Sequence, residues 1–428
     1  MSHAAHAAKS QGTGKQSMPM DHQMDNGMTH EMMFAGIPET RRASGTSWQP
    51  DETEMHAFHS KLGEWNVMTH FNVFLSYDYQ SGRRGDDQVN STNWLMLMAS
   101  RPVGTNGEFT FRTMLSLEPA TATTEGYPLL FQTGETYHGN PLIDRQHPHD
   151  FFMELAAMYR HQLAEKTSLS FYLAASGEPA LGPTAFPHRA SAADNPAAPL
   201  SHHWQDATHI SFGVATIGLT HDKWQFEASA FNGHEPDEDR WDFDSIDFNS
   251  YAGRISYNPT PNWSMQVSHG FIESPEALHP DEDVRRTTAS ISHSKALANG
   301  GRCDTSLIWG HNSIDGNGTN SVLLESNVRL NSLWTVFGRA EWVEKSGEEL
   351  GLIDEDREFG ITQLTLGGSR ELTPGKPFSC ALGASVSYSF APNALDNLYG
   401  DDPWGAWVFF RVRPAKMNHD AMPMSMSK

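Results

Sequence analysis

The chain has 428 residues, with 52 Asp and Glu against 30 Lys and Arg, and a formal net charge of -22 at pH 7. A nucleic acid partner requires a basic face, so this charge balance excludes one. The mean hydropathy is -0.52, and no run approaches the ~20 apolar residues of a membrane-spanning helix. We therefore exclude helical membrane spans.

The first 60 residues are polar and rich in Met and His, as in MPMDHQMDNGMTHEMM. Such a composition buries too little apolar surface to fold alone, so we expect residues 1–60 to form a largely disordered tail. The opening MSHAAHAAKS lacks the apolar core of a signal peptide. The protein is then either cytosolic or a mature chain with an added start methionine, and the strand pattern described below favours the second. A second Met-rich tail is expected at 415–428.

From residue 61 onward, apolar and polar residues alternate with period two, which indicates β-strands. In the clearest stretch, 208–232, Ile210, Phe212 and Val214 form the apolar face of one strand, and a short polar turn, THDK, separates it from the next. We expect strands near 65–79, 92–101, 108–118, 151–163, 167–177, 208–220, 224–233, 250–258, 263–273, 284–297, 301–314, 320–331, 333–345, 359–372, 377–391 and 404–413.

The connections between these strands alternate between long and short. Only the link 315–319 is short where a long one is expected. A closed antiparallel barrel in an outer membrane has short periplasmic turns and long extracellular loops, whereas a propeller or β-helix would show a fixed repeat, which we do not find. We predict an all-β fold, a closed antiparallel transmembrane β-barrel of about 16 strands over residues 61–414. Both termini are then expected in the periplasm of a Gram-negative bacterium.

Two groups of aromatic residues fit the interfacial girdles of such a barrel. Trp224, Trp263 and Trp334 begin strands at the short-turn end. The group expected near the long-loop end is Tyr77, Tyr79, Trp94, Trp309 and Trp342. The last strand, WGAWVFFRVRP, resembles the final strand of outer-membrane barrels but continues into a tail.

If the apolar phase faces lipid, the opposite phase gathers charged residues in the lumen. They either select solutes in a wide aqueous channel or pair with one another and stiffen the wall. The long loops 119–150 and 178–207 are the candidates to plug or narrow that channel. The predicted lining residues are His70, Arg112, Glu154, Arg160, Glu227, Arg254, Arg286, Glu325, Arg329, Arg339 and Glu341.

Both tails combine thioether and imidazole side chains. Thioethers are soft ligands that stay unprotonated, and with imidazole they suit copper ions. The other interpretations are a short helix with a Met stripe that docks on a surface and simple low complexity. The predicted tail ligands are Met18, Met20, His22, Met24, Met28, His30, Met32, Met417, His419, Met422, Met424 and Met426.

In tail composition and general architecture the chain resembles the outer-membrane copper-resistance proteins of Gram-negative bacteria. This resemblance implies a role in copper handling, with copper ions bound but no cofactor required. The C-terminal Met-rich tail has no counterpart that we can map onto that family.

A second candidate metal site lies in DRQHPHDFF, where His147 and His149 flank Pro148. Residues at i and i+2 of an extended segment point the same way, so both imidazoles could reach one ion. The alternative is that they hydrogen-bond to loop backbone and anchor the loop at the barrel mouth. Further imidazoles near in sequence are His138, His188, His202, His203 and His209.

We do not predict an enzyme. Some outer-membrane barrels hydrolyse lipids with a Ser and a His, and His293 with Ser290 or Ser292 is the nearest approach here, alongside His269 and His311. No nucleophile-elbow motif accompanies them.

The sequence thus predicts an outer-membrane porin-like channel that handles or passes copper or related soft metal ions. The alternatives are a general solute porin with no metal role and an outer-membrane lipid hydrolase. The expected partners are outer-membrane lipid, metal ions or small solutes, and periplasmic metal-handling proteins, with oligomers also compatible.

Overall fold

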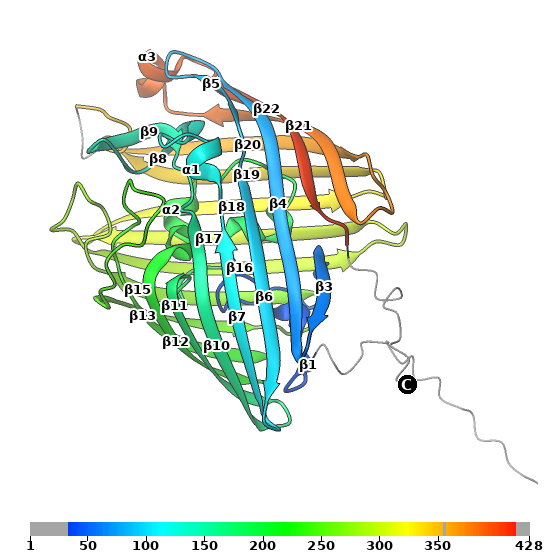
Figure 1. Cartoon of the computed structure of the whole chain (residues 1–428). Helices are drawn as coiled ribbons and strands as arrows, with labels where there is room; N and C mark the ends of the chain where they lie inside the picture. Colours follow the sequence, from blue (N-terminus) through cyan, green and yellow to red (C-terminus); the bar gives the residue numbers. More distant parts are fainter. Residues whose placement is uncertain (1–32, 354–356, 417–428) are drawn as a thin grey trace, which may run out of the picture. The chain divides into compact units, whose positions relative to one another are not determined.

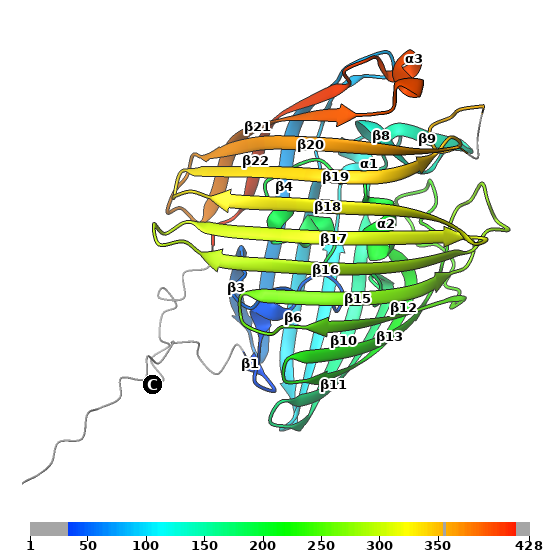
Figure 2. The same cartoon turned by 180° about the vertical axis from the view of Figure 1, so that it is seen from behind.

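The structure, a computed structural model, describes residues 33–353 and 357–416. Sixteen antiparallel strands form the wall of a closed barrel (Figures 1 and 2), and two short strands, β3 (Ala57–Leu62) and β5 (Asp87–Asn90), pair beside the first of them. The ring closes where the last strand pairs with the first, from Gly405 opposite Gln80 to Val412 opposite Val73. The predicted fold class is confirmed.

The strands of the wall agree with the predicted ones to within a few residues. They are β4 (Trp65–Gln80), β6 (Asn93–Val103), β7 (Gly107–Leu115), β10 (Phe152–Ala164), β11 (Thr167–Gly177), β12 (Ser211–His221), β13 (Trp224–Phe231), β14 (Ser250–Tyr257), β15 (Trp263–Ile272), β16 (Val284–Ala296), β17 (Arg302–Ile314), β18 (Asn317–Arg329), β19 (Trp334–Ser346), β20 (Glu358–Glu371), β21 (Phe378–Phe390) and β22 (Trp404–Pro414). Long and short connections alternate around the ring, and β17 and β18 are joined by a two-residue turn, 315–316.

Apolar side chains cover the outside of the wall. Leu366, Val386 and Val267 are more than half exposed there, while their strand neighbours of opposite phase point into the lumen. Such a surface is stable against lipid, and closure satisfies the backbone groups of every wall strand. No helix among the described residues is long and apolar enough to cross a membrane.

Three aromatic or aliphatic residues lie on the other side of the wall from the one predicted. Trp94 is 7% exposed, and Phe212 and Val214 are fully buried, whereas Ile217 and Leu219 of the same β12 strand are exposed on its outer face. The prediction was wrong here because it assumed a wet lumen. Val214 instead belongs to a buried apolar cluster that includes Leu181 of the segment 178–210, so an apolar side chain is favoured on the inner face.

Two segments fill the lumen. The first, residues 33–56, contains β1 (Met33–Phe34), β2 (Ile37–Pro38) and the 3-10 helix η2 (Glu39–Arg41). The predicted disordered tail therefore extends too far, because residues 33–60 fold against the wall. The second, residues 178–210, is called the inserted loop. It contains η3 (Phe186–His188), η4 (Ala190–Ala192), α2 (His202–Gln205) and η5 (Ala207–His209).

Smaller elements cap the long-loop end of the wall (Figure 1). The connection from β7 to β10 holds α1 (Glu118–Thr121) and a hairpin of β8 (Tyr127–Tyr137) and β9 (Asn140–Gln146). The connection from β21 to β22 holds η6 (Asn393–Leu395) and α3 (Asp396–Tyr399). Phe131 of the hairpin stacks on Tyr399 with ring centroids 4.1 Å apart, so the two caps pack together.

The apolar outer face predicts a depth-dependent cost for a charge. We expect Leu366→Arg, in the middle of β20, to lower the free energy of unfolding in lipid vesicles by about 2–4 kcal/mol, and Leu372→Arg, in the short turn after β20, to lower it by at most about 1 kcal/mol. Urea titration followed by tryptophan emission measures both. Equal effects at the two positions would contradict a bilayer around this wall.

Candidate functional site

All eleven predicted lining residues face the lumen, and nine of them are buried. Most are ion-paired. Arg112 contacts Glu154 at 2.6 Å, and Arg254 contacts Glu227 at 3.0 Å. Glu341 accepts hydrogen bonds from the Ser201 backbone N–H and hydroxyl, both at 3.2 Å. The pairing predicted as one of two interpretations is therefore present, and many of the partners belong to the inserted segments.

The inserted loop is fastened by buried charges. The Arg189 guanidinium lies 2.9 Å from Asp206 within the loop and 2.6 Å from Glu325 of the wall, and Glu325 also contacts Arg339 at 3.0 Å. Asp194 of the loop pairs with Arg411 of β22. Since a buried charge without its partner is strongly destabilising, these pairs hold the loop in the lumen.

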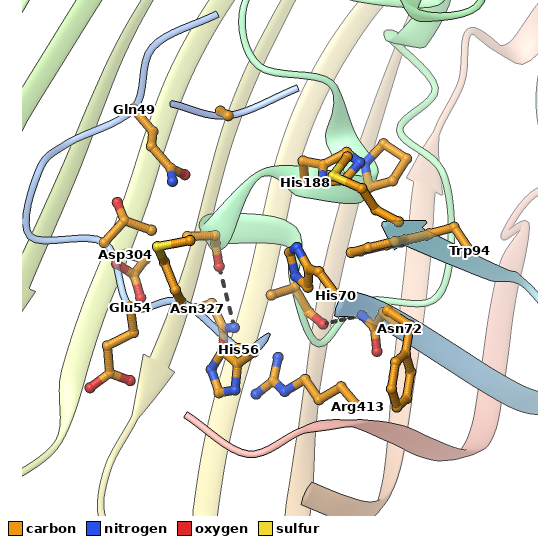
Figure 3. Close-up of a pocket in the computed structure, with 18 of the residues that line it drawn as sticks. Gln49, Glu54, His56, His70, Asn72, Trp94, His188, Asp304, Asn327 and Arg413 are labelled. Atoms are coloured by element: carbon orange, nitrogen blue, oxygen red, sulfur yellow. Dashed lines mark hydrogen bonds between the residues drawn. The ribbon is translucent and has the colours of Figure 1, made fainter. Parts of the chain in front are cut away.

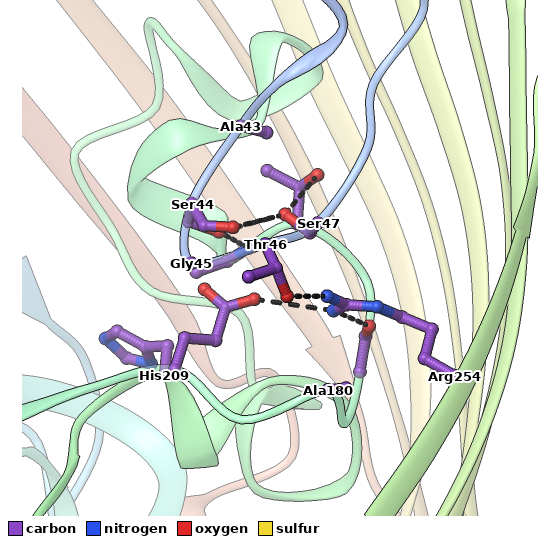
Figure 4. Close-up of polar contacts among 12 residues, drawn as sticks. Ala43, Ser44, Gly45, Thr46, Ser47, Ala180, His209 and Arg254 are labelled. Atoms are coloured by element: carbon purple, nitrogen blue, oxygen red, sulfur yellow. Dashed lines mark hydrogen bonds and ion pairs between the residues drawn. The ribbon is translucent and has the colours of Figure 1, made fainter. Parts of the chain in front are cut away.

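The N-terminal segment is fastened in the same way (Figure 4). Arg254 donates to the Thr46 hydroxyl at 3.0 Å. Arg112 donates to the Gly45 carbonyl at 2.5 Å. Nearer the short-turn end, Glu54 pairs with Arg329 of β18. The wall charges thus hold two inserted segments rather than facing an open bore.

Five histidines meet where the inserted loop touches the β7–β10 connection. One ring nitrogen each of His147, His202 and His203 lies within 4.8 Å of the other two. The His202 and His209 ring centroids are 5.2 Å apart, as are those of His149 and His209. We call these residues the histidine cluster: His147, His149, His202, His203 and His209.

Each imidazole of the histidine cluster is oriented through Nδ1. His149 Nδ1 lies 2.8 Å from Glu118, and His202 Nδ1 lies 2.7 Å from Asp206. The remaining Nδ1 contacts are His147 with Glu135 at 3.3 Å, His203 with Glu235 at 3.6 Å and His209 with the Asp206 carbonyl at 2.8 Å. Where Nδ1 donates to a carboxylate or carbonyl oxygen, as the geometry of His149, His202 and His209 allows, Nε2 of the neutral ring keeps its lone pair.

All five Nε2 atoms are buried, and within residues 33–353 and 357–416 none has a hydrogen-bond partner. Buried polar atoms normally find partners, so five orphaned acceptors in one place require an explanation. Burial lowers the pKa of His202 to about 4 and holds the pKa values of His147 and His209 well below the ordinary value. His147, His202 and His209 are therefore neutral imidazoles at neutral pH, the form that binds metal ions.

Gly134 of the β8 strand makes room for the cluster. Its φ is 114°, and a Cβ at this position would lie 2.3 Å from Cε1 and 2.4 Å from Nε2 of His203. A side chain at Gly134 would displace the His203 ring. The hairpin is thus shaped to the histidines of the loop below it.

A cavity of about 760 Å³ lies outside the histidine cluster, between the β8–β9 hairpin and the connection 232–249. Two of its carboxylates, Glu135 and Glu235, also orient His147 and His203. Seven acidic residues line this cavity, and their negative charge attracts cations. We call them the acidic rim: Glu135, Glu235, Asp237, Glu238, Asp239, Asp242 and Asp244.

Two further cavities lie below the cluster, toward the short-turn end. His149 lines a cavity of about 40 Å³, and that cavity shares Trp94 and Pro187 with a larger one of about 130 Å³ (Figure 3). Shared residues link these parts: Glu135 and Glu235 join the acidic rim to the histidine cluster, and His149 joins the cluster to the inner cavities.

The anchoring role predicted for His147 and His149 is present, since Nδ1 of His147 lies 3.3 Å from the Pro148 carbonyl and Nδ1 of His149 lies 2.8 Å from Glu118. Their role as metal ligands stays a prediction. His138 lies apart, exposed at the tip of the hairpin. The predicted tail ligands lie outside the described residues. They are Met18, Met20, His22, Met24, Met28, His30, Met32, Met417, His419, Met422, Met424 and Met426.

The candidate Ser–His pair of a hydrolase does not assemble. His293 has the outward phase of β16 and packs on Trp263 with ring centroids 4.3 Å apart, while Ser290 and Ser292 have the inward phase. Ser292 instead hydrogen-bonds to Ser306 at 3.0 Å. The wall separates the imidazole from both hydroxyls.

The sequence prediction missed the inner face of β4, β6 and β7, where Met68, Met96, Met98 and Met114 are buried. The available signal was that both phases of NWLMLMAS are apolar. A strand with two apolar phases indicates that both of its faces are covered.

No family model matches the chain, and no curated protein sequence matches it. Among solved structures, the anion-selective porin from Comamonas acidovorans is similar at a TM-score of 0.53 and 11% identity, with 82% of this chain and 100% of that chain covered. OmpF of Salmonella typhi in complex with daunomycin matches at a TM-score of 0.49 and 8% identity, with 83% and 100% covered. The first of these similarities shows the fold: the chain forms a porin-type barrel.

The charge pairs of the inserted loop predict how the lumen can be opened. We expect Arg189→Ala to leave Asp206 and Glu325 short of a cation, to destabilise the loop by about 3–5 kcal/mol and to raise single-channel conductance in a planar bilayer. The control is Arg145→Ala in strand β9, which removes a contact with Asp86 of the β4–β5 connection. Unchanged conductance in Arg189→Ala would show that the loop does not close the lumen.

Proposed function

We propose that this protein is a barrel of the Gram-negative outer membrane that binds transition-metal cations, copper foremost, in its lumen and passes them between the acidic rim and the short-turn end. The observation that carries the proposal is the set of five buried Nε2 atoms without hydrogen-bond partners. Imidazole suits copper, zinc and nickel. A carboxylate on the far nitrogen is the usual support of a metal-binding histidine.

The location follows from the outer surface. A closed wall with an apolar exterior and aromatic residues such as Trp224 and Trp334 exposed at the short-turn end fits an outer membrane. With that orientation the long loops face outward and both tails face the periplasm. Their Met and His residues would then exchange copper with the short-turn end of the barrel.

A general solute porin is the alternative that the fold also fits. Two features favour the metal-ion channel. The charges predicted to line a pore are engaged in pairs, and the rim leads to imidazoles rather than to an aqueous bore. Lipid hydrolysis is not proposed, because His293 and Ser290 lie on opposite faces of the wall.

Titration of the purified full-length protein tests the site. To remove the contribution of the tails, every Met and His within 2–32 and 417–428 is replaced by Ser. In this background we expect His202→Ala to weaken Zn(II) and Cu(II) binding by at least the roughly 10–100-fold that loss of a supporting residue causes. His293→Ala, on the outer face, is the matched control.

The outcomes separate the proposals. Unaltered binding in His202→Ala would end the metal assignment of the histidine cluster. Equal copper content and equal cellular copper tolerance with native and Ser-substituted tails would remove the tails from the proposal but leave the lumen site. Release of copper from loaded proteoliposomes, measured with and without a thiol reductant, at the rate of protein-free vesicles in both cases would contradict passage.

Gly134 provides an independent test. We expect Gly134→Ala to displace His203 and to weaken Zn(II) binding by about tenfold or more. Gly139→Ala, on the same hairpin, is the control because it also has a positive φ of 69° but no neighbour within 4 Å of the added Cβ. If both variants bind Zn(II) equally well, the position of His203 is irrelevant to the ion.

A further inference from the structure

Soft donors form a row across three adjacent wall strands below the histidine cluster. In the register of the sheet, His70 of β4 is opposite Met96 of β6, and Met96 is opposite Met114 of β7. All three have the inward phase, and Met96 and Met114 are each 4% exposed. One row nearer the short turns, Met68 is opposite Met98.

The inserted loop brings one imidazole to this row. His188, at the end of η3, places its Nε2 2.9 Å from Met114 Sδ. The His188 ring lies 4.5 Å from the Trp94 ring and 5.9 Å from the His70 ring, centroid to centroid. Figure 3 shows His70, His188 and Trp94 together on one side of the inner cavity.

The carboxylates of this cavity are engaged elsewhere. Glu54 pairs with Arg329, and Asp194 pairs with Arg411. Figure 3 shows Glu54 on the opposite side of the cavity from His188. The donors left at the row are therefore neutral thioethers and imidazoles, unlike the histidine cluster with its supporting carboxylates.

We propose that His188, Met114, Met96 and His70 form a second metal site, specific for a soft monovalent cation, Cu(I) or Ag(I). Thioether sulfur selects soft cations, whereas zinc and divalent copper favour the imidazoles above. The Trp94 ring beside His188 adds a π face that attracts a cation and excludes water. The ordinary alternative is that methionine fills an irregular gap between wall and loop.

This inference rests on the proposed function and adds to it the oxidation state of copper, Cu(I), that the inner site binds. A Cu(II) ion that leaves the histidine cluster must be reduced by one electron before it binds here, and a periplasmic or medium reductant such as a thiol would supply that electron. Binding of Cu(I) or Ag(I) to the site needs no such step. Its test is therefore separate from that of the histidine cluster.

Ag(I), which is soft and does not change oxidation state, is the probe. The protein is the full-length chain with Ser-substituted tails, titrated with Ag(I) by calorimetry and counted by native mass spectrometry. We expect Met114→Leu and His188→Gln each to lose one Ag(I) or to bind it at least tenfold more weakly, while Zn(II) binding stays at the wild-type value. Met158→Leu is the control, a buried methionine of β10 whose sulfur contacts Arg42 at 3.4 Å.

Three results would overturn the second site. Ag(I) binding that is unchanged in both Met114→Leu and His188→Gln shows that the row holds no ion. An equal loss in Met158→Leu shows a packing effect. A parallel loss of Zn(II) in the same variants shows one site rather than two. If Met114→Leu does not fold, Met96→Leu replaces it. X-ray absorption at the silver edge of the parent chain is then measured as well, and we expect it to show sulfur ligands.

Discussion

The bore of the barrel is the constraint from which the rest of the structure follows. A closed ring of about 16 strands is too wide for the side chains of opposite walls to meet. Either water fills it or the chain supplies its own filling. Here the chain does so twice, with residues 33–56 and 178–210, and many inward charges of the wall become points of attachment. Arg189 and Glu325 show the principle, since each is buried and each depends on the other.

Filling the bore also creates the histidine cluster. The backbone of an inserted loop carries polar groups that the wall must satisfy, and the same loop can place side chains at the axis, which wall residues cannot reach. His202, His203 and His209 arrive in this way, and the β7–β10 connection brings His147 and His149 from the other side. Support through Nδ1 fixes each ring. The price is a set of unpartnered Nε2 atoms that a bound cation would satisfy.

Much of the fold could be predicted from the sequence, because period two and the lengths of the connections are local signals. The strands, their number and the sorting of the loops follow from them. The filling of the lumen could not be predicted, since no local signal says that residues 33–56 turn inward. The wrong placement of Trp94 and Val214 has this cause: their apolar character was taken to mean lipid, and it means contact with the inserted loop.

The candidate site, like the fold, could be predicted from the sequence only in part. The pattern around Pro148 indicated that His147 and His149 point the same way, and the histidines of the inserted loop were named as possible partners. Their convergence depends on long-range packing between two connections about 60 residues apart along the chain. The buried methionines of β6 and β7 were visible as a second apolar phase in the sequence. Their possible role as metal ligands depends on His188, which contacts Met114 because the inserted loop lies in the lumen.

The pair between Asp194 and Arg411 links the loop to the last strand of the wall. The same strand, β22, pairs with β4 and so closes the ring. Closure of the wall and attachment of the loop at Asp194 therefore depend on one strand. The two proposed metal sites, which both use residues of that loop, depend on it as well.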